Sequence, residues 1–323
     1  MKKIPRFFRR LIYVLIVLGL FWTVVNLIKP YQVTDNNLWK KQDMTLISAH
    51  RGGAELNPEN TKMAFDYVIN ETNYTDIVEF DVRLTKDDEL VIIHDETINR
   101  TGINNEQSDV VIRERTYEEL KNYNLGVNFE KDGIKPYADI SLSSAEKLGL
   151  TIMTLEDFFD RYQDSRYFRI FLEIKDKEET GILAVDKVEE LLASSKYSMW
   201  DSRVMIISFS KDVVKHVVNN YPNRYVAGMG YNMVGSMIGS KLHLDSLFKV
   251  KFHSIQTSMK VKVGPFNLNC ATKGFVKSAH KRNQSVVYWT INDESDMQKL
   301  IDLGADIITT DSPDILAKVL GKK

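Results

Sequence analysis

Residues 77–82 read IVEFDV, a short run of β-branched and aromatic residues interrupted by two acids. Apart from those acids the run is apolar without alternation, which is typical of a strand buried on both faces. Glu79 and Asp81 stand two residues apart, and this spacing places both carboxylates on one face of a strand. The stretch therefore predicts a strand of a buried parallel sheet that presents a pair of acids.

Similar apolar runs recur along the chain and alternate with helical patterns. The expected strands are Leu46–His50, Ile77–Val82, Phe168–Lys175, Val204–Ser208, Tyr225–Met229, Ser254–Gln256, Val286–Thr290 and Asp306–Thr310. The expected helices are Thr61–Asn70, Gly181–Ser195, Lys211–Asn219, Cys270–Arg282, Glu294–Leu303 and Pro313–Leu320. This alternation predicts an α/β fold, a (β/α)8 TIM barrel, with a doubly wound open sheet as the alternative.

Two additions interrupt the alternation after the second strand. Leu84–His94 (LTKDDELVIIH) predicts a hairpin arm, and residues 97–150 form an irregular insertion. A loop of that length in a compact domain usually has a function. A third unusual stretch, Ala227–Ser240 (AGMGYNMVGSMIGS), is rich in Gly and Met. We interpret it as ordinary loop packing, with an adaptable apolar lip at the barrel mouth as the alternative.

The amino terminus differs from the rest of the chain in charge. The chain has 43 basic and 44 acidic side chains, and its first 30 residues contain Lys2, Lys3, Arg6, Arg9, Arg10 and Lys29 but no acid. Leu11–Ile28 has no charged residue, and as a helix it would be about 27 Å long, close to the hydrocarbon thickness of a bilayer. We expect a basic tail at 1–10, a transmembrane helix at 11–28, a linker at 29–43 and the barrel at 44–323.

The basic tail predicts a single-pass protein of the cytoplasmic membrane, with its N-terminus inside and the barrel outside. A cleaved signal peptide and a buried core helix are the alternatives, but no small-x-small cleavage site follows the apolar run. Cys270 is the single cysteine, so the chain forms no intrachain disulfide. The near-zero net charge argues against a nucleic-acid partner, and the oligomeric state stays open.

Polar residues stand where the expected strands end, which is where TIM barrels carry their chemistry. Glu173 and Lys175 repeat the i, i+2 spacing of Glu79 and Asp81. The other polar residues at strand ends are His50, Arg51, His94, Asp95, Trp289, Thr310 and Asp311. We expect Asp311 to fix a turn, Asn60 to cap a helix, and Asp95 to orient His94 or to end its strand.

The chemistry of this set is that of a phosphodiester hydrolase. Burying the carboxylates of Glu79, Asp81 and Glu173 together is unfavourable unless a cation neutralises them. Hard oxygen ligands suit Ca²⁺ or Mg²⁺. Arg51 and Lys175 supply hydrogen-bond donors for an anionic oxygen, and phosphate is the obvious group. His50 and His94 are candidates for general acid and base.

Ordered motifs across residues 45–315 resemble the glycerophosphodiester phosphodiesterase family. They are His50-Arg51-Gly52, Pro58-Glu59-Asn60-Thr61, Glu79-x-Asp81-Val82, Thr85-Lys86-Asp87, His94-Asp95, Arg100-Thr101, Thr154-Leu155-Glu156, Leu172-Glu173-Ile174-Lys175, Ser208-Phe209, Trp289-Thr290-Ile291-Asn292 and Thr310-Asp311-x-Pro313. Two departures concern helix packing and a turn: Met153 replaces a proline, and YVINETNYTD replaces an Ala-x-x-x-Gly pattern before the second strand.

The resemblance implies a TIM-type barrel that hydrolyses a glycerophosphodiester to glycerol phosphate and an alcohol. It implies catalysis by His50 and His94, and ligation of one Ca²⁺ or Mg²⁺ ion by Glu79, Asp81 and Glu173. Arg51 is implied as a phosphate contact, and Lys175 and Trp289 as residues of the substrate site. Lysolipids or glycerolipids, cleaved as by a phospholipase D, and polymeric glycerophosphate such as teichoic acid are alternative substrates. A tethered module that binds a phosphate ligand without turnover is the alternative outside enzymes.

Overall fold

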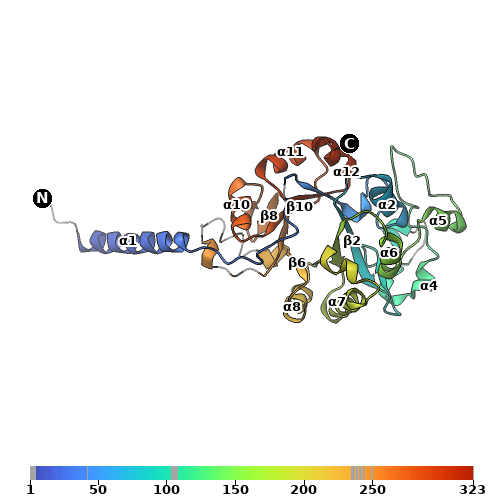
Figure 1. Ribbon diagram of the computed structural model, residues 1–323, viewed down its shortest axis with the longest axis horizontal. Coiled ribbons are helices and arrows are strands. Elements are labelled where there is room, and N and C mark those ends of the chain that lie inside the picture. Colours follow the sequence, from blue (N-terminus) through green and yellow to red (C-terminus); the bar gives the residue numbers. More distant parts are fainter. Residues whose placement is uncertain are drawn as a thin grey trace.

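The computed structural model describes residues 5–322 except 42, 103–107, 234–236, 238, 240, 241, 243, 248 and 250. In this described part, eight parallel strands close into a barrel surrounded by helices (Figure 1). The barrel strands are β1 (Leu46–Ala49), β2 (Ile77–Leu84), β4 (Arg169–Ile174), β5 (Val204–Ile207), β6 (Tyr225–Gly228), β7 (Ser254–Thr257), β10 (Ser285–Tyr288) and β11 (Ile307–Thr310). β1 pairs with both β2 and β11, which closes the ring and confirms the predicted TIM barrel over an open sheet.

The helices between the strands bury one face each against the barrel. They are α2 (Lys62–Asp66), α6 (Leu155–Tyr162), α7 (Glu178–Ala193), α8 (Lys211–Asn220), α10 (Lys273–Lys281), α11 (Glu294–Leu303) and α12 (Pro313–Val319). Phe158 on α6, for example, packs 4.7 Å from Phe80 of β2, measured between ring centroids. The helix predicted at Thr61–Asn70 is shorter than expected, because α2 ends at Asp66 and a π-helical turn continues to Glu71.

The insertion after β2 packs around a small hydrophobic cluster of its own. The hairpin arm before it contains β3 (Leu90–Ile92), which pairs antiparallel with β2 and confirms the predicted hairpin. The helices of the insertion are α3 (Asn99–Gly102), α4 (Tyr117–Leu120) and α5 (Leu142–Leu148). Ile98, Ile112 and Leu120 are buried there against Val91 and Ile152. The insertion is thus a packed unit at the edge of the barrel.

A second hairpin, between β7 and α10, is absent from the sequence-based prediction. β8 (Lys260–Val263) and β9 (Phe266–Asn269) pair antiparallel. Their signal is present in the sequence, since KVKV alternates polar and apolar residues and Gly264-Pro265 follows as a turn. The predicted helix at Cys270–Arg282 therefore begins later, at Lys273.

The Gly/Met-rich stretch packs into the protein where its side chains are described. Met229 lies inside the barrel, and Met233 and Met237 belong to the hydrophobic cluster under α10 and α11. Each of these side chains is buried. Ile238 lies outside the described residues. Ordinary packing, the favoured interpretation, is confirmed for these three methionines.

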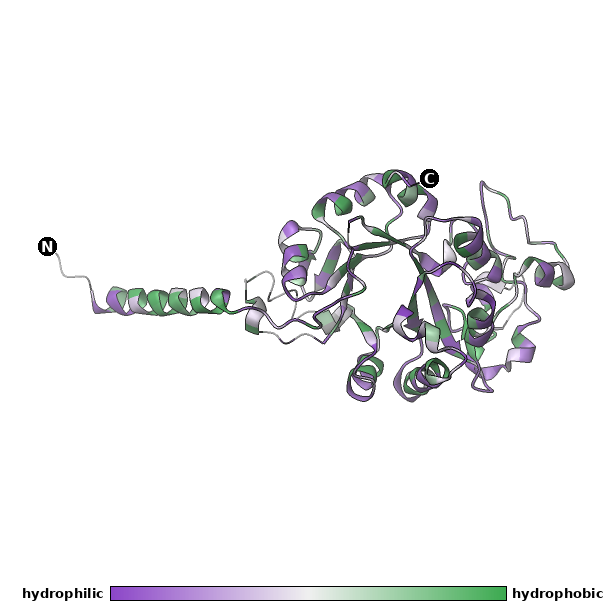
Figure 2. Ribbon diagram, in the orientation of Figure 1, coloured by the Kyte–Doolittle hydropathy of each residue, from purple (hydrophilic) through white to green (hydrophobic). Residues whose placement is uncertain are grey.

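The amino-terminal helix α1 (Arg6–Leu27) projects from the barrel (Figure 1). Among the described residues it alone is long and apolar enough to cross a membrane, with a mean hydropathy of 2.0 over its most apolar window. Figure 2 shows it as a mainly hydrophobic rod with little protein around it. A signal sequence near the N-terminus meets the same criteria as a membrane span.

Residues 33–41, here called the strap, are bound to the barrel. The side chain of Asn37 donates to the carbonyl oxygens of His253 and Asn283, at 2.6 and 2.8 Å. Trp39 is fully buried and stacks on Phe171 with ring centroids 5.1 Å apart. Since Phe171 belongs to the interior of the barrel, Trp39 closes the amino end of the ring.

Candidate active site

The three predicted carboxylates meet inside the carboxyl end of the barrel. Glu79 and Asp81 lie on β2 and Glu173 on the neighbouring β4, where Asp81 and Glu173 stand in register. One oxygen of each lies within 4.8 Å of the others, and all three side chains are buried. The prediction that Glu79 and Asp81 share one face is confirmed. The strand pairing brings Glu173 to the same point.

This cluster is electrostatically unfavourable unless a cation lies in it. Burial and repulsion from Asp81 raise the pKa of Glu79 to about 8, and the same causes raise the pKa of Glu173. Asp81 stays ionised, because the charges of Arg51 and Lys175 outweigh burial and lower its pKa. Nearby, the buried Oδ1 of Asn60 has no hydrogen-bond partner among the described residues. These oxygens suit a hard divalent cation, so the cluster can hold a metal ion.

Arg51 reaches the cluster because its backbone turns sharply after β1. Arg51 has a φ of 51°, in the left-handed region, and Gly52 and Gly53 follow with φ of 80° and 88°. A Cβ atom on Gly52 would lie 2.9 Å from Cβ of Ala64, so only glycine fits there. The Arg51 N–H donates to Oε2 of Glu79 at 2.8 Å. The turn thereby places the backbone of Arg51 at the acids.

The guanidinium of Arg51 lies between two acids. Its Nε atom lies 3.4 Å from Oδ2 of Asp81, and its Nη1 atom donates to Oε1 of Glu59 at 2.9 Å. Burial lowers the pKa of Arg51, but the acids around it raise that pKa by more. The guanidinium is therefore a permanent cation. Arg51 therefore offers a fixed positive charge beside the carboxylate cluster.

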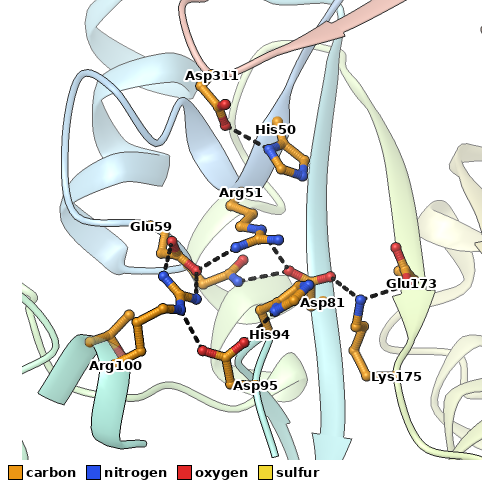
Figure 3. Close-up of polar contacts among 12 residues, drawn as sticks. His50, Arg51, Glu59, Asp81, His94, Asp95, Arg100, Glu173, Lys175 and Asp311 are labelled. Carbon is orange, nitrogen blue, oxygen red and sulfur yellow. Dashed lines mark hydrogen bonds and ion pairs between the residues drawn. The ribbon is translucent and has the colours of Figure 1, made fainter. Parts of the chain in front are cut away.

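His50 is held by a carboxylate from the last barrel strand. Its Nδ1 atom lies 2.6 Å from Oδ1 of Asp311 (Figure 3). Its Nε2 atom lies 4.0 Å from Oε2 of Glu79. Asn292 fixes Asp311 by donating to its Oδ2 at 2.7 Å. Burial lowers the pKa of His50, but Glu79 and Asp311 raise it more, so its net pKa is above the usual value.

His94 is held by a carboxylate in the same way as His50. Its Nδ1 atom lies 2.6 Å from Oδ1 of Asp95, and Asp95 also accepts from Nε of Arg100 at 2.5 Å (Figure 3). Arg100 makes two further hydrogen bonds to the carboxylate of Glu59, at 2.7 and 2.8 Å. Burial and the charge of Arg51 lower the pKa of His94 below its usual value.

Lys175 and Trp289 occupy different parts of the barrel mouth. Nζ of Lys175 donates to Oε1 of Glu173 at 2.8 Å and lies 3.6 Å from Oδ1 of Asp81. Trp289 follows β10, and the ring of Phe209 packs against it with centroids 5.6 Å apart. The indole N–H of Trp289 is buried and has no hydrogen-bond partner among the described residues. It is an available donor at the mouth.

Several residues of this network have contacts that the sequence did not predict, and the expected helix cap at Asn60 is wrong because Thr61 caps α2. Asp311 was expected to fix a turn but binds His50, and Asn60 donates to Asp81 at 3.0 Å while Thr61 caps α2. Glu59 and Arg100 were noted only as parts of motifs. Their pairing joins a residue after β1 to α3 of the insertion, a long-range contact that no local pattern contains.

A model of the glycerophosphoryl diester phosphodiesterase family matches residues 50–315. The chain is 31% identical over 280 residues to a glycerophosphodiester phosphodiesterase from Caldanaerobacter subterraneus subsp. tengcongensis, covering 86% of this chain and 98% of that protein. It is 24% identical to human lysophospholipase D GDPD1, covering 93% of this chain and 94% of that protein. The chain therefore belongs to the glycerophosphoryl diester phosphodiesterase family, and it is a phosphoric diester hydrolase.

Solved structures of low sequence identity share the fold. A phosphodiesterase from Oleispira antarctica, in complex with the product sn-glycerol-3-phosphate, has a TM-score of 0.63 and 21% identity, covering 86% of this chain and 98% of that one. A glycerophosphodiester phosphodiesterase from Agrobacterium tumefaciens has a TM-score of 0.61 and 19% identity, covering 85% of this chain and 100% of that one. Both confirm the barrel of this chain.

Proposed function

We propose that the carboxyl end of the barrel hydrolyses a glycerophosphodiester to glycerol phosphate and an alcohol. One observation carries the proposal: His50 and His94 are each held through Nδ1 by a carboxylate, and the charges of Arg51 and the acidic cluster act on both rings. In both rings the Nε2 atom is left to exchange a proton with substrate. The family's name and the product bound to the Oleispira relative support this substrate class.

The charges around the two histidines differ and suggest different roles. His50 lies next to Asp311 and Glu79, which favour the imidazolium, so His50 donates a proton to the leaving oxygen. Burial is the largest influence on His94 and, together with Arg51 and Lys175, it outweighs Asp81 and Asp95 and favours the neutral ring, so His94 takes the proton of the nucleophile. Arg51 and Lys175 bind the phosphoryl oxygens, and Trp289 contacts the substrate at the mouth.

Glu79, Asp81 and Glu173 would hold one divalent cation, Ca²⁺ or Mg²⁺. The ion would supply Lewis-acid stabilisation of charge on the phosphoryl oxygens. All three ligands are carboxylates and no Cys or His is among them, which favours these hard cations over zinc. Arg51 and Lys175 stand beside the acids and keep Asp81 in the charged form that binds a cation.

Turnover of a panel of glycerophosphodiesters tests this function. The full chain is assayed with glycerophosphocholine, glycerophosphoethanolamine and glycerophosphoglycerol, in chelator and in added Ca²⁺ or Mg²⁺. His50→Ala and His94→Ala each lower turnover by about 10²–10⁴-fold, the usual contribution of general acid–base catalysis. His216→Ala, on α8 and bonded to Asp186, is the control and keeps wild-type turnover. Full activity in either site variant contradicts the proposal.

We also propose that α1 stays attached as a membrane anchor, with the basic tail in the cytoplasm and the barrel outside. The length and hydropathy of α1 support a span, and the basic residues before it support this orientation. Retention of the full-length chain in membranes after alkaline extraction supports the anchor. A mature protein that begins after residue 28 contradicts it. Protease added to intact cells or spheroplasts should digest the barrel.

A lysolipid substrate is the second candidate. The name of the human relative, lysophospholipase D, favours it, and that relative matches over nearly all of this chain. The apolar lip considered for such a substrate is not available from Met229, Met233 and Met237, because these side chains are buried. Water-soluble diesters are therefore the favoured substrates.

A further inference from the structure

One sector of the barrel is basic, although the domain as a whole is acidic. Residues 213–292, which run from within α8 to just after β10, contain 11 basic side chains and one acid, Asp245. The rest of the chain after residue 30 contains 26 basic and 43 acidic side chains. A separation of this size gives one side of the domain a positive potential.

Seven lysines of this sector are exposed and lie on three segments of the barrel wall. α10 contributes three at a spacing of four residues, which places them in one row on its outer face. On β8 the lysines alternate with valines, and Val261 packs on the hydrophobic cluster under α10, so the lysines point away from that cluster. The other two lysines precede β7. We call the seven side chains the basic wall: Lys249, Lys251, Lys260, Lys262, Lys273, Lys277 and Lys281.

The basic wall has no partner inside the protein. None of its ammonium groups forms an ion pair or a hydrogen bond with another residue that the structure describes. Arg224, in the same sector, is the contrast, because it is buried and bonded to Glu189 and Asp201 at 2.6 Å each. Lysines four residues apart on one helix repel each other. A row of them without acids between them therefore indicates a surface that meets an anionic partner.

The basic wall lies next to the point where α1 meets the barrel. Figure 1 shows α1 leaving the ring of helices sideways, on the side that carries α10 and β8. The indole of Trp22 donates to the carbonyl of Leu242 at 3.3 Å, and the hydroxyl of Ser246 donates to the carbonyl of Val25 at 2.7 Å. The last turns of α1 are thus bonded to the loop that leads into the basic wall.

The same loop presents apolar side chains to solvent. Leu242 and Leu247 are 54% and 50% exposed. Basic and apolar side chains that are exposed together are typical of a surface that binds the interface of an anionic membrane. A soluble polyanion would give the lysines a partner but would leave both leucines in water. The combination therefore favours a lipid surface as the partner.

We propose that the basic wall, with Leu242 and Leu247, is an interface for anionic phospholipids of the membrane that α1 enters. The lysines bind the phosphate groups of the lipid headgroups, and the two leucines enter the apolar edge of the bilayer. The proposal goes beyond the hydrolase function and rests on α1 as an anchor. No residue of the basic wall belongs to the site at the carboxyl end of the barrel, so the two proposals can fail independently.

Fluorescence quenching in vesicles tests this interface without an activity assay. Cys270 is buried, so a cysteine introduced at the surface is the reactive one. Asn267 is exposed and pairs with Lys262 across the hairpin, whereas Asn122 follows α4, which Figure 1 shows far from α1. Full-length Asn267→Cys and Asn122→Cys carry a bimane label and are reconstituted with a lipid that has a quencher on its headgroup.

The lipid composition decides the expected result. In phosphatidylcholine mixed with phosphatidylglycerol we expect strong quenching of the label at Asn267, and in phosphatidylcholine alone we expect weak quenching there. The label at Asn122 should not be quenched in either mixture. Because α1 inserts in both mixtures, only the charge of the surface differs between them. Salt at about 1 M, where the screening length is about 3 Å, should remove the difference between the mixtures.

Removing the lysines of α10 tests whether charge causes the contact. One variant combines Lys273→Gln, Lys277→Gln and Lys281→Gln. At about 5-fold per lysine near an anionic surface, it should lower the ratio of quenched to unquenched label at Asn267 by about 100-fold in the mixed vesicles. The control removes three exposed lysines outside the basic wall and should leave the ratio unchanged. It combines Lys135→Gln, Lys147→Gln and Lys318→Gln.

Several results would overturn the proposal. Equal quenching at Asn267 in both lipid mixtures does so, as does quenching that the α10 variant leaves unchanged. Stronger quenching at Asn122 than at Asn267 does so as well. Soluble polyphosphate is the probe for the competing partner, an anionic polymer. If it changes the fluorescence of the label at Asn267 while the mixed vesicles do not quench that label, the basic wall binds a polymer and the proposal is wrong.

Flotation and turnover separate this inference from the other two proposals. A protein that floats with the mixed vesicles but not with phosphatidylcholine vesicles lacks the anchor and keeps the interface. A protein that floats with neither overturns both. The α10 variant should keep wild-type turnover of glycerophosphocholine, because its lysines lie outside the site. Quenching at Asn267 without any turnover by the wild-type chain would contradict the hydrolase function and support the interface.

Discussion

Nδ1 of His50, after the first barrel strand, lies 2.6 Å from a carboxylate oxygen of Asp311, after the last one. This bond fixes the ring and helps to keep the imidazole protonated. Because β1 and β11 are neighbours in the ring, the closure of the barrel itself brings the two residues together. The bond makes Asp311 a positioning residue for the proposed acid.

Asp311→Asn should therefore lower kcat by roughly 100-fold, within the usual contribution of general acid–base catalysis. Asp311 raises the pKa of His50, so its loss should shift the His50 limb of the pH–rate profile to lower pH. Kinetics across pH 5–9 check both effects. Asp314→Asn, on the exposed side of α12, is the control. A fall in kcat with an unmoved pH profile would contradict the role of Asp311.

Arg100 joins the insertion to both halves of the site, because it binds Asp95 beside His94 and Glu59 beside Arg51. Lysine lacks the planar fork that makes these paired bonds. Arg100→Lys should lower kcat/KM by about 10-fold, in line with one charge-assisted hydrogen bond of about 1.5 kcal/mol. Arg113→Lys, which affects a pair with Asp88 in the same region, should leave kcat/KM unchanged. Equal effects of the two substitutions would contradict the link.

The variant Glu79→Gln tests separately how the acidic cluster affects the stability of the protein and how it binds a cation. Burial and the charge of Asp81 raise the pKa of Glu79. Replacing this carboxyl group by a neutral amide should therefore not lower the melting temperature of the protein in chelator. Glutamine keeps an oxygen for the Arg51 N–H but removes a charged cation ligand. The rise of the melting temperature on adding Ca²⁺ or Mg²⁺ should disappear. Thermal unfolding with both ions checks this, with Glu89→Gln on the hairpin arm as the control that keeps the rise.

Trp39→Ala should lower the free energy of unfolding by about 3–5 kcal/mol, the usual cost of removing a buried aromatic side chain. Trp39 is fully buried and packs on Phe171, with Tyr225 5.9 Å away between ring centroids. Denaturant unfolding in detergent provides the measurement. Leu38→Ala, an exposed neighbour in the strap, should change the free energy by less than about 0.5 kcal/mol. Similar values for both would contradict the closing role of Trp39.

His253 makes the barrel sensitive to acid at its amino end. Burial lowers the pKa of His253 to about 4, and its Nδ1 atom accepts from the Val226 N–H at 3.3 Å. The unfolded chain, with a histidine pKa of about 6.5, binds this proton first, so stability falls as the pH decreases from about 6.5 to 4, by up to about 3 kcal/mol. Unfolding free energies across this range should show a smaller slope for His253→Asn, and an unchanged slope contradicts the account.

The sequence predicted the barrel well because buried parallel strands are continuous apolar runs. All eight expected strands form within two residues of their predicted bounds. Glu79 and Asp81 were predictable because their shared face depends only on the strand period. Glu173 could be added to this pair only from the family resemblance or from the order of the strands, because the insertion separates β2 from its neighbour β4 in the chain.

The network behind the histidines could not be predicted from local patterns. Asp311 meets His50 only when the first and last strands pair, and Arg100 meets Glu59 only when the insertion folds back on the turn after β1. The strap is a similar case. Its polar residues were expected to form a linker, yet the side chains of Asn37 and Trp39 find partners at the starts of distant strands.

The pairing of β1 with β11 also sets the order in which the protein can fold. Leu46 has its partner Ile307 at the other end of the domain, so the ring cannot close until synthesis is nearly complete. Contacts between residues so far apart in the chain form slowly. Until then β1 has an unpaired edge, which is prone to aggregation. With α1 inserted in the membrane, as proposed, that edge would wait at a fixed place on the bilayer surface, separated from other copies.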